Sequence, residues 1–194
     1  MSAKFRIILV SSTLLAILIL SHFRLHSQSL EFFEESLLFE INDGIFTVDG
    51  QYYFRNTGQK ELTQVLFYPF PAGEGAEPAD SVSVTEIPVS TEQRLIHQSE
   101  KGFSFLIHLK AGEEKAYHIH YRQKVRNHAT YILTSTQHWG KPLEKAFYQL
   151  TVPAGIQITG FSYPPDYQEN KTNERIYYWF RQDFMPDRDF EIEF

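Results

Sequence analysis

The feature that most constrains the fold of this chain is a hairpin signal at Asp43-Gly44. Asp and Gly both tolerate positive φ, and a two-residue type I′ turn between strands is built from such a pair. With this loop, Phe39 faces Val48 across the hairpin. One face then collects the apolar side chains, namely Leu37, Phe39, Ile41, Phe46, Val48, Tyr52 and Phe54. Because turn chemistry and hydrophobic alternation agree on the register, we expect two antiparallel strands with one buried face.

The same alternation continues toward the end of the chain. It predicts further strands over residues 62–68, 81–85, 94–98, 131–135, 146–152, 156–163, 175–180 and 189–194. The first of these is apolar on both faces, which is typical of a central strand. A second hairpin is predicted over Gly102–Lys124, with an odd-numbered loop around Gly112 that brings both apolar stripes to one face. No ten-residue segment beyond residue 30 has a helical period, so we expect an all-β fold, an antiparallel β-sandwich of roughly ten strands.

An apolar run over Ile7–Leu20 precedes the β-rich part. Lys4 and Arg6 lie before it, and the first acidic residue is Glu31. A basic flank followed by about 15 apolar residues is what the export machinery recognises, so we expect an N-terminal hydrophobic helix. Residues 1–29 are then a signal peptide or an N-terminal membrane anchor, and residues 30–194 are the β-sandwich domain. The small residues needed for cleavage lie far from the run, at 27–29, which favours an anchor with its amino terminus inside.

Charge and composition exclude several classes of function. Three of the 18 basic residues and none of the 24 acidic residues precede residue 30, so 15 basic and 24 acidic residues give the domain a formal charge of −9. An acidic domain without a basic stripe is a poor binder of nucleic acid. Cys is absent, which excludes disulfides and a Cys nucleophile. Neither a nucleophile elbow nor a phosphate-binding loop occurs, so we expect no catalytic residues, no cofactor and no enzymatic activity.

Two stretches resemble the vault/inter-alpha-trypsin (VIT) domain family. The segment from Gly50 to Asn56, followed by a strand that ends in Pro69-Phe70-Pro71, resembles the opening of these domains. Residues 109–121 resemble a later hairpin of the family, and the whole resemblance covers about residues 45–125. Similar patterns occur in bacterial exported β-domains of unknown function. The resemblance implies a β-sandwich with a protein-interaction role and transfers no functional residue.

Three histidines form the sharpest candidate site. In the predicted second hairpin, His108 lies near His118, and His120 is two residues further along the same face. Three imidazoles on neighbouring strands can ligate Zn²⁺ and leave a fourth position for water. The competing interpretation places them on a solvated face beside Lys110 and Arg122. Whether His108, His118 and His120 bind a metal is left open.

Exposed aromatic side chains would support glycan binding. Trp139 follows a polar segment and is expected on a loop. A second group could form a platform, namely Tyr163, Tyr167, Tyr177 and Trp179. Residues 176–180 are apolar on both faces, however, which favours a buried strand.

We therefore interpret the chain as an extracytoplasmic, membrane-tethered β-sandwich in the periplasm or at the cell surface. It is expected to be an interaction module without catalytic activity that binds a protein or a cell-envelope component. The alternatives are a glycan-binding module that uses loop aromatics, and a zinc site on the three histidines.

Overall fold

The computed structural model describes residues 29–71, 77–88 and 91–194, and nearly all of its regular structure is β-strand. The all-β prediction is therefore confirmed for these residues. The predicted N-terminal helix lies outside the described residues. Within them, no helix has the length and apolar character needed to cross a bilayer.

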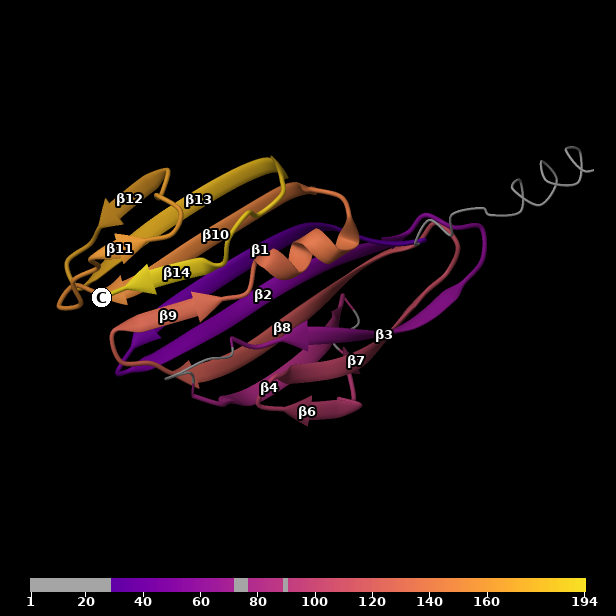
Figure 1. Ribbon diagram of the computed structural model, residues 1–194, viewed down its shortest axis with the longest axis horizontal. Helices are drawn as coiled ribbons and strands as arrows, with labels where there is room; N and C mark the ends of the chain where they lie inside the picture. The colour runs from indigo at the N-terminus through magenta and orange to yellow at the C-terminus, as the bar shows by residue number, and fades with distance from the viewer. Residues whose placement is uncertain (1–28, 72–76, 89–90) are drawn as a thin grey trace, which may run out of the picture.

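One eight-stranded sheet extends through the domain (Figure 1). Its strands, in spatial order, are β12 (Tyr167–Asn170), β13 (Glu174–Phe184), β10 (Leu143–Pro153), β1 (Leu30–Asn42), β2 (Ile45–Asn56), β8 (Glu114–Lys124), β4 (Ala79–Ile87) and β5 (Thr91–Glu92). The sheet is mixed rather than purely antiparallel as expected, because β1 and β10 are parallel neighbours. Parallel strands need a crossover connection, and here the chain passes through other strands between β1 and β10.

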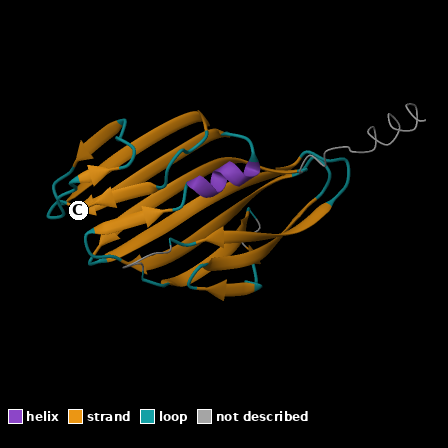
Figure 2. Cartoon of the chain, in the orientation of Figure 1, coloured by secondary structure: helices purple, strands orange, loops and turns teal. Residues whose placement is uncertain are grey.

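Two three-stranded sheets lie over one face of the large sheet and form a second layer (Figure 1). One has the order β11 (Gly160–Phe161), β14 (Phe190–Glu193), β9 (His128–Tyr131), and the other has the order β3 (Leu62–Pro69), β7 (Gly102–Leu109), β6 (His97–Ser99). The short 3-10 helix η1 (Thr134–Trp139), drawn as a coil in Figure 2, follows β9 on the same side. The core lies between the layers, where Phe39 stacks on Phe190 with ring centroids 5.1 Å apart. The sandwich is thus present, with its second layer in two parts.

The first hairpin has the predicted register. Phe39 pairs with Val48 and Ile41 with Phe46. Asp43 and Gly44 have φ angles of 50° and 72°, the left-handed conformations that a type I′ turn requires. All the side chains predicted for its apolar face are buried.

The second predicted hairpin, Gly102–Lys124, is wrong. β7 pairs with β3 and β6, whereas β8 pairs with β2 and β4. The turn around Gly112 carries the chain from one layer to the other, and the apolar stripes of the two strands meet across the core. The rings of Phe105 and Tyr117 lie 5.6 Å apart there. Alternation identifies the buried face of each strand, but it does not distinguish two neighbouring strands from two stacked ones.

Asn56 holds this crossing in place. Its side-chain amide donates hydrogen bonds to the carbonyls of Lys60 at 2.7 Å and Lys110 at 2.9 Å. The backbone carbonyl of Asn56 accepts a hydrogen bond of 3.0 Å from the Gly112 N–H. Because Asn56 is 1% exposed, these bonds satisfy a polar side chain that water does not reach.

β3 is not the central strand that its apolar sequence predicts. It lies at the end of the β3-β7-β6 sheet, and Val65 and Phe67 are 52% and 56% exposed. Two other predicted strands are shorter than expected. The strand over residues 131–135 ends at Tyr131, and residues 156–163 contribute only Gly160–Phe161.

Candidate ligand site

A cavity of about 490 Å³ lies between β3 and η1, where the second layer is divided. Its floor is the large sheet, which contributes Phe32, Glu35, Tyr52, Phe54 and Ile119. One wall consists of six consecutive β3 residues, from Gln64 to Pro69, and the other consists of η1 and the residues just before it. The volume and the lining, which consists mainly of aromatic and aliphatic residues, are typical of a small-ligand site.

Glu35 is buried in the floor of this pocket and is 2% exposed. A β-bulge at Phe33 shifts the register of β1, so that Phe32 and Glu35 both face inward. The Glu35 carboxylate accepts hydrogen bonds from the Tyr148 hydroxyl at 2.6 Å and from the Tyr131 hydroxyl at 3.4 Å. Burial raises the pKa of Glu35 to about 7, although both tyrosine donors act to lower it. The floor therefore holds an acid that titrates near neutral pH.

A chain of tyrosine hydroxyls leads from β3 to this acid. The hydroxyls of Tyr68 and Tyr52 are 2.7 Å apart, and those of Tyr52 and Tyr131 are 3.0 Å apart. Burial raises the pKa of all three tyrosines well above the ordinary value, so they remain protonated. With each hydroxyl donating toward Glu35, the chain ends on the carboxylate and stabilises its negative charge.

Trp139, the last residue of η1, lines the pocket opposite β3. Its ring centroid lies 5.9 Å from that of Phe32 and 5.7 Å from that of Phe54. Gly140 follows with a φ of 68° and ends the helix. Trp139 is therefore half-buried on a helix that packs on the large sheet, and not on the loop that its polar neighbours predict.

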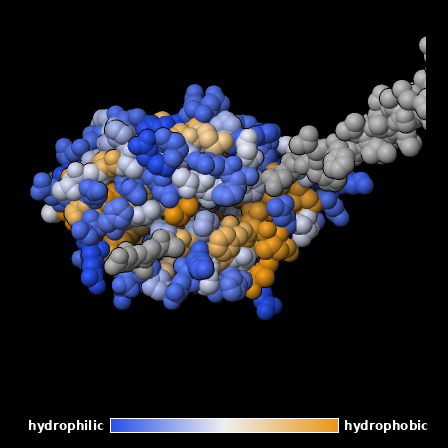
Figure 3. Space-filling view, in the orientation of Figure 1, coloured by the Kyte–Doolittle hydropathy of each residue, from blue (hydrophilic) through white to orange (hydrophobic). Residues whose placement is uncertain are grey.

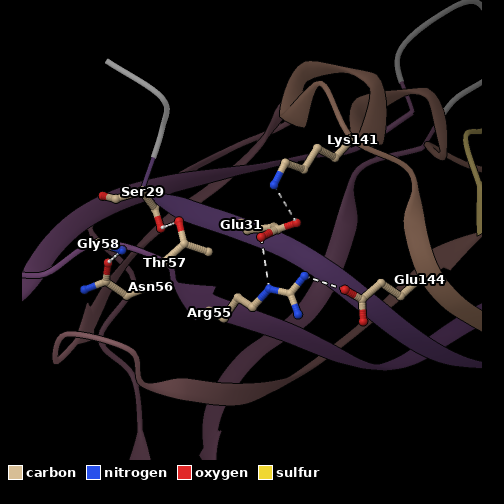
Figure 4. Close-up of polar contacts among 8 residues, drawn as sticks. All are labelled: Ser29, Glu31, Arg55, Asn56, Thr57, Gly58, Lys141 and Glu144. Atoms are coloured by element: carbon tan, nitrogen blue, oxygen red, sulfur yellow. Dashed lines mark hydrogen bonds and ion pairs between the residues drawn. The ribbon is translucent and has the colours of Figure 1, made fainter. Parts of the chain in front are cut away.

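Ion pairs fix the segment that follows Trp139 (Figure 4). Glu31 of β1 accepts hydrogen bonds from Arg55 Nε at 2.9 Å and from Lys141 Nζ at 3.1 Å, and Arg55 also pairs with Glu144. The bond from Arg55 lowers the pKa of Glu31 against the opposing effect of burial. These contacts join residues 141–144, which follow Trp139 closely in the sequence, to β1 and β2.

The three predicted histidines are not brought together. His118 and His120 lie on β8, where Asp49 accepts hydrogen bonds from His118 Nε2 at 2.6 Å and from His120 Nδ1 at 3.2 Å. His108 lies in the other layer, with its Nδ1 2.8 Å from Thr63 Oγ1. In the described part of the chain, no three His, Asp or Glu side chains are grouped to hold a metal ion. The three-histidine arrangement is wrong because it depended on the second hairpin.

The predicted aromatic platform is mostly part of the core. Tyr177 and Trp179 are buried, as the buried-strand interpretation predicts, but Phe180 on the other face of the strand is 59% exposed. The Tyr163 hydroxyl donates a 2.8 Å hydrogen bond to Asp187. Tyr167 is exposed and stacks on Tyr178, with ring centroids 5.8 Å apart.

Glu35 is the site residue that the sequence analysis did not single out, although a signal for it exists. Leu37, Phe39 and Ile41 alternate on the inward face of β1, and extending this pattern by one step places Glu35 on the same face. A glutamate at the end of an apolar stripe is ordinarily solvated, which hides this signal. The tyrosines that surround it come from four other strands, and sequence spacing does not reveal their convergence.

Comparisons with known proteins show a shared fold without a shared family. No protein-family model matches the sequence, and no curated protein matches it. The resemblance to VIT domains therefore stays a prediction.

Two solved structures superpose on most of this chain. A protein from Legionella pneumophila, named only as a candidate nutrient binding protein, has a TM-score of 0.61 and 14% identity over 84% of this chain and 66% of its own length. An M1 zinc metallopeptidase from Deinococcus radiodurans has a TM-score of 0.53 and 10% identity over 86% of this chain and 42% of its own length. This chain thus spans less than two thirds of either protein, and similarity at this level shows the fold alone.

Proposed function

We propose that this protein is a non-catalytic binding module that acts outside the cytoplasm, tethered by its N-terminal segment, and that the pocket over Glu35 is its ligand site. The observation that carries the proposal is the ionisable Glu35 on the floor of a pocket lined mainly by aromatic and aliphatic residues. Burying such a group costs free energy, and groups with strongly shifted pKa values cluster at functional sites. The binding role in the name of the Legionella protein agrees with a binding module.

The surroundings of Glu35 favour binding over catalysis. Its hydrogen-bond partners are Tyr131 and Tyr148, and burial raises the pKa of both hydroxyls. A hydroxyl with a raised pKa stays protonated and is not activated as a nucleophile. These tyrosines therefore supply hydrogen bonds to Glu35 rather than an activated nucleophile.

The pocket chemistry favours an organic cation with an apolar body. Among the lining residues Glu35 is the only carboxylate, and none is Lys or Arg. Aromatic faces attract ammonium and guanidinium groups, and a buried carboxylate adds a charge-assisted hydrogen bond. Each carboxylate oxygen accepts one tyrosine bond and has capacity for a second. We therefore propose that the ligand, part of a protein or of a cell-envelope component, presents a cationic group to Glu35.

Calorimetric titration with three indole probes tests this function. Tryptamine, tryptophol and indole-3-propionate share one ring and carry a cationic, a neutral and an anionic end group. At pH 8, where Glu35 is ionised, tryptamine is expected to bind about tenfold more tightly than tryptophol, because a hydrogen bond between charged groups contributes more than a neutral one. Indole-3-propionate is expected to bind most weakly.

Matched variants locate the binding. Glu35→Gln should reduce the affinity for tryptamine to that for tryptophol, whereas Glu34→Gln, on the opposite face of β1, should leave both unchanged. Trp139→Ala should lower the affinity for all three probes. If none of the probes binds, or if Trp139→Ala has no effect, the pocket is not the ligand site.

A further inference from the structure

The wall that β3 contributes to the pocket is the edge of the strand. Six consecutive residues, 64–69, line the cavity. A strand face presents only every second residue, so a run of consecutive residues can line a cavity only along the strand's edge. β3 is also the terminal strand of the β3-β7-β6 sheet, and its second edge faces the side of η1 (Figure 1).

The hydrogen bonds around β7 show which backbone groups point to this edge. The Ile96 N–H bonds to the Ser104 carbonyl, so Ser104 faces β6. Phe67 pairs with Ser104, and its N–H and C=O therefore point away from β7. The Phe70 N–H bonds to the Lys101 carbonyl, so the backbone groups of Phe70 point toward the β7 side. Because this direction alternates along a strand, odd-numbered β3 residues point away from β7, in agreement with Phe67. Thr63, Val65 and Phe67 thus direct their backbone groups away from β7, toward the open edge, and within the described residues no backbone bond is made to them.

This edge lacks the features that usually prevent strand pairing. Residues 62–69 carry no charge, and their single proline, Pro69, is the last residue of the strand. Val65, Phe67 and Leu106 are large apolar side chains more than two-fifths exposed. Hydrophobic residues gather over β3 in the space-filling view (Figure 3). Natural edges of this kind are ordinarily protected by charges, bulges or covering segments.

We infer that β3 receives an extended segment of another polypeptide as an added strand, and that a Lys or Arg side chain of this segment enters the pocket over Glu35. A strand beside β3 would lie about 4.8 Å from it and above the pocket floor, with every second side chain pointing down. Main-chain bonds to Thr63, Val65 and Phe67 supply affinity, and the pocket selects the side chain. The inference rests on the proposed function, because it identifies the carrier of the cationic group.

Capped pentapeptides test the strand and the side chain separately. The probes are acetyl-Thr-Val-Xaa-Val-Thr-amide with Lys, Arg, norleucine or Glu at Xaa, titrated into the full-length protein at pH 8 by NMR. The Lys and Arg peptides are expected to bind about tenfold more tightly than the norleucine peptide, and the Glu peptide least. Successive N–H groups of a strand point to opposite edges, so N-methylation of Xaa and of the next Val removes one N–H on each edge of the peptide. This change should weaken the binding of the Lys peptide by about tenfold or more.

A variant of the edge gives the complementary measurement. Thr63 does not line the pocket, and its N–H points away from β7, so Thr63→Pro should weaken the Lys peptide while tryptamine still binds. Thr63→Ala keeps the N–H and should behave as the unmodified protein. Near-UV circular dichroism checks the fold of both variants. The N-methylated peptide tests the main-chain bonds on the unmodified protein, so that measurement does not depend on the folding of a variant.

The outcomes separate this inference from the function on which it rests. Binding of tryptamine without binding of any peptide, or a Lys peptide insensitive to N-methylation, overturns strand addition and leaves the ligand pocket standing. Failure of both tryptamine and the peptides removes the proposed function as well. Self-association of the protein that Thr63→Pro abolishes would assign the edge to a second copy and contradict a separate partner.

Discussion

Glu35 keeps an ionisable group among aromatic rings, and this lowers the stability of the folded state at neutral pH. Its carboxyl group has an ordinary pKa of 4.5, which burial raises to about 7. The folded protein therefore holds this proton more tightly than the unfolded chain does. Below pH 4.5 the group is protonated in both states, and between pH 4.5 and 7 the unfolded chain releases the proton first. The free energy of unfolding thus falls as the pH rises through this window, and above it the penalty is constant.

Replacing Glu35 by Gln should remove this pH dependence. The difference in pKa corresponds to a penalty on the order of 3 kcal/mol at pH 8. Urea unfolding between pH 4 and 8 should show the free energy of Glu35→Gln rising relative to that of the unmodified protein as the pH increases. Glu34→Gln serves as the matched control and should follow the unmodified protein. Parallel curves for Glu35→Gln and the unmodified protein would contradict a buried acid at this position.

At the scale of elements, the sequence predicts local structure better than the pairing of distant segments. The Asp43-Gly44 turn determines the register of β1 and β2 because both strands adjoin it. The alternation in β7 and β8 identifies their buried faces, yet it fits side-by-side strands and stacked strands equally well. What separates the two arrangements is Asn56, a buried side chain more than fifty residues from Lys110, whose carbonyl it binds. No periodic pattern in the sequence carries that information.

Replacing Asn56 by Ala should therefore destabilise the crossing between the layers. The change leaves the carbonyls of Lys60 and Lys110 without their 2.7 and 2.9 Å donors. Leaving a carbonyl without its donor costs at most about 1–3 kcal/mol. Because these two carbonyls are only partly buried, chemical unfolding should show a loss of about 2–4 kcal/mol in total. Asn42→Ala is the control, because Asn42 is exposed and makes one 3.4 Å bond to Glu40. Equal stabilities of the two variants would exclude this role for Asn56.

Over the whole molecule, the candidate site arises where the second layer is divided. Its floor comes from β1, β2 and β8, and its walls come from β3 and η1. The sandwich and most strands could be predicted from alternation, because each strand carries its own pattern. The pocket could not, because it depends on how two small sheets are placed over the large one. The position of the second layer therefore controls both the stability of the domain and the geometry of the site.

Removing residues 190–194 should abolish cooperative unfolding and ligand binding together. Phe190 and Ile192 are 1% and 0% exposed, and the Phe190 ring lies 4.9 Å from that of Trp179. Loss of two such side chains costs about 2–5 kcal/mol each, which is most of the stability of a typical domain. β9 pairs with β14, so its Tyr131 would also lose the support that holds it over Glu35. Differential scanning calorimetry should show no sharp transition for the shortened chain, and tryptamine should not bind.

The double variant Glu191→Gln, Glu193→Gln is the control for this truncation. It changes only the outward side chains of β14 and should retain cooperative unfolding and tryptamine binding. A shortened chain that melts at the unmodified midpoint would show that the large sheet folds without this part of the second layer.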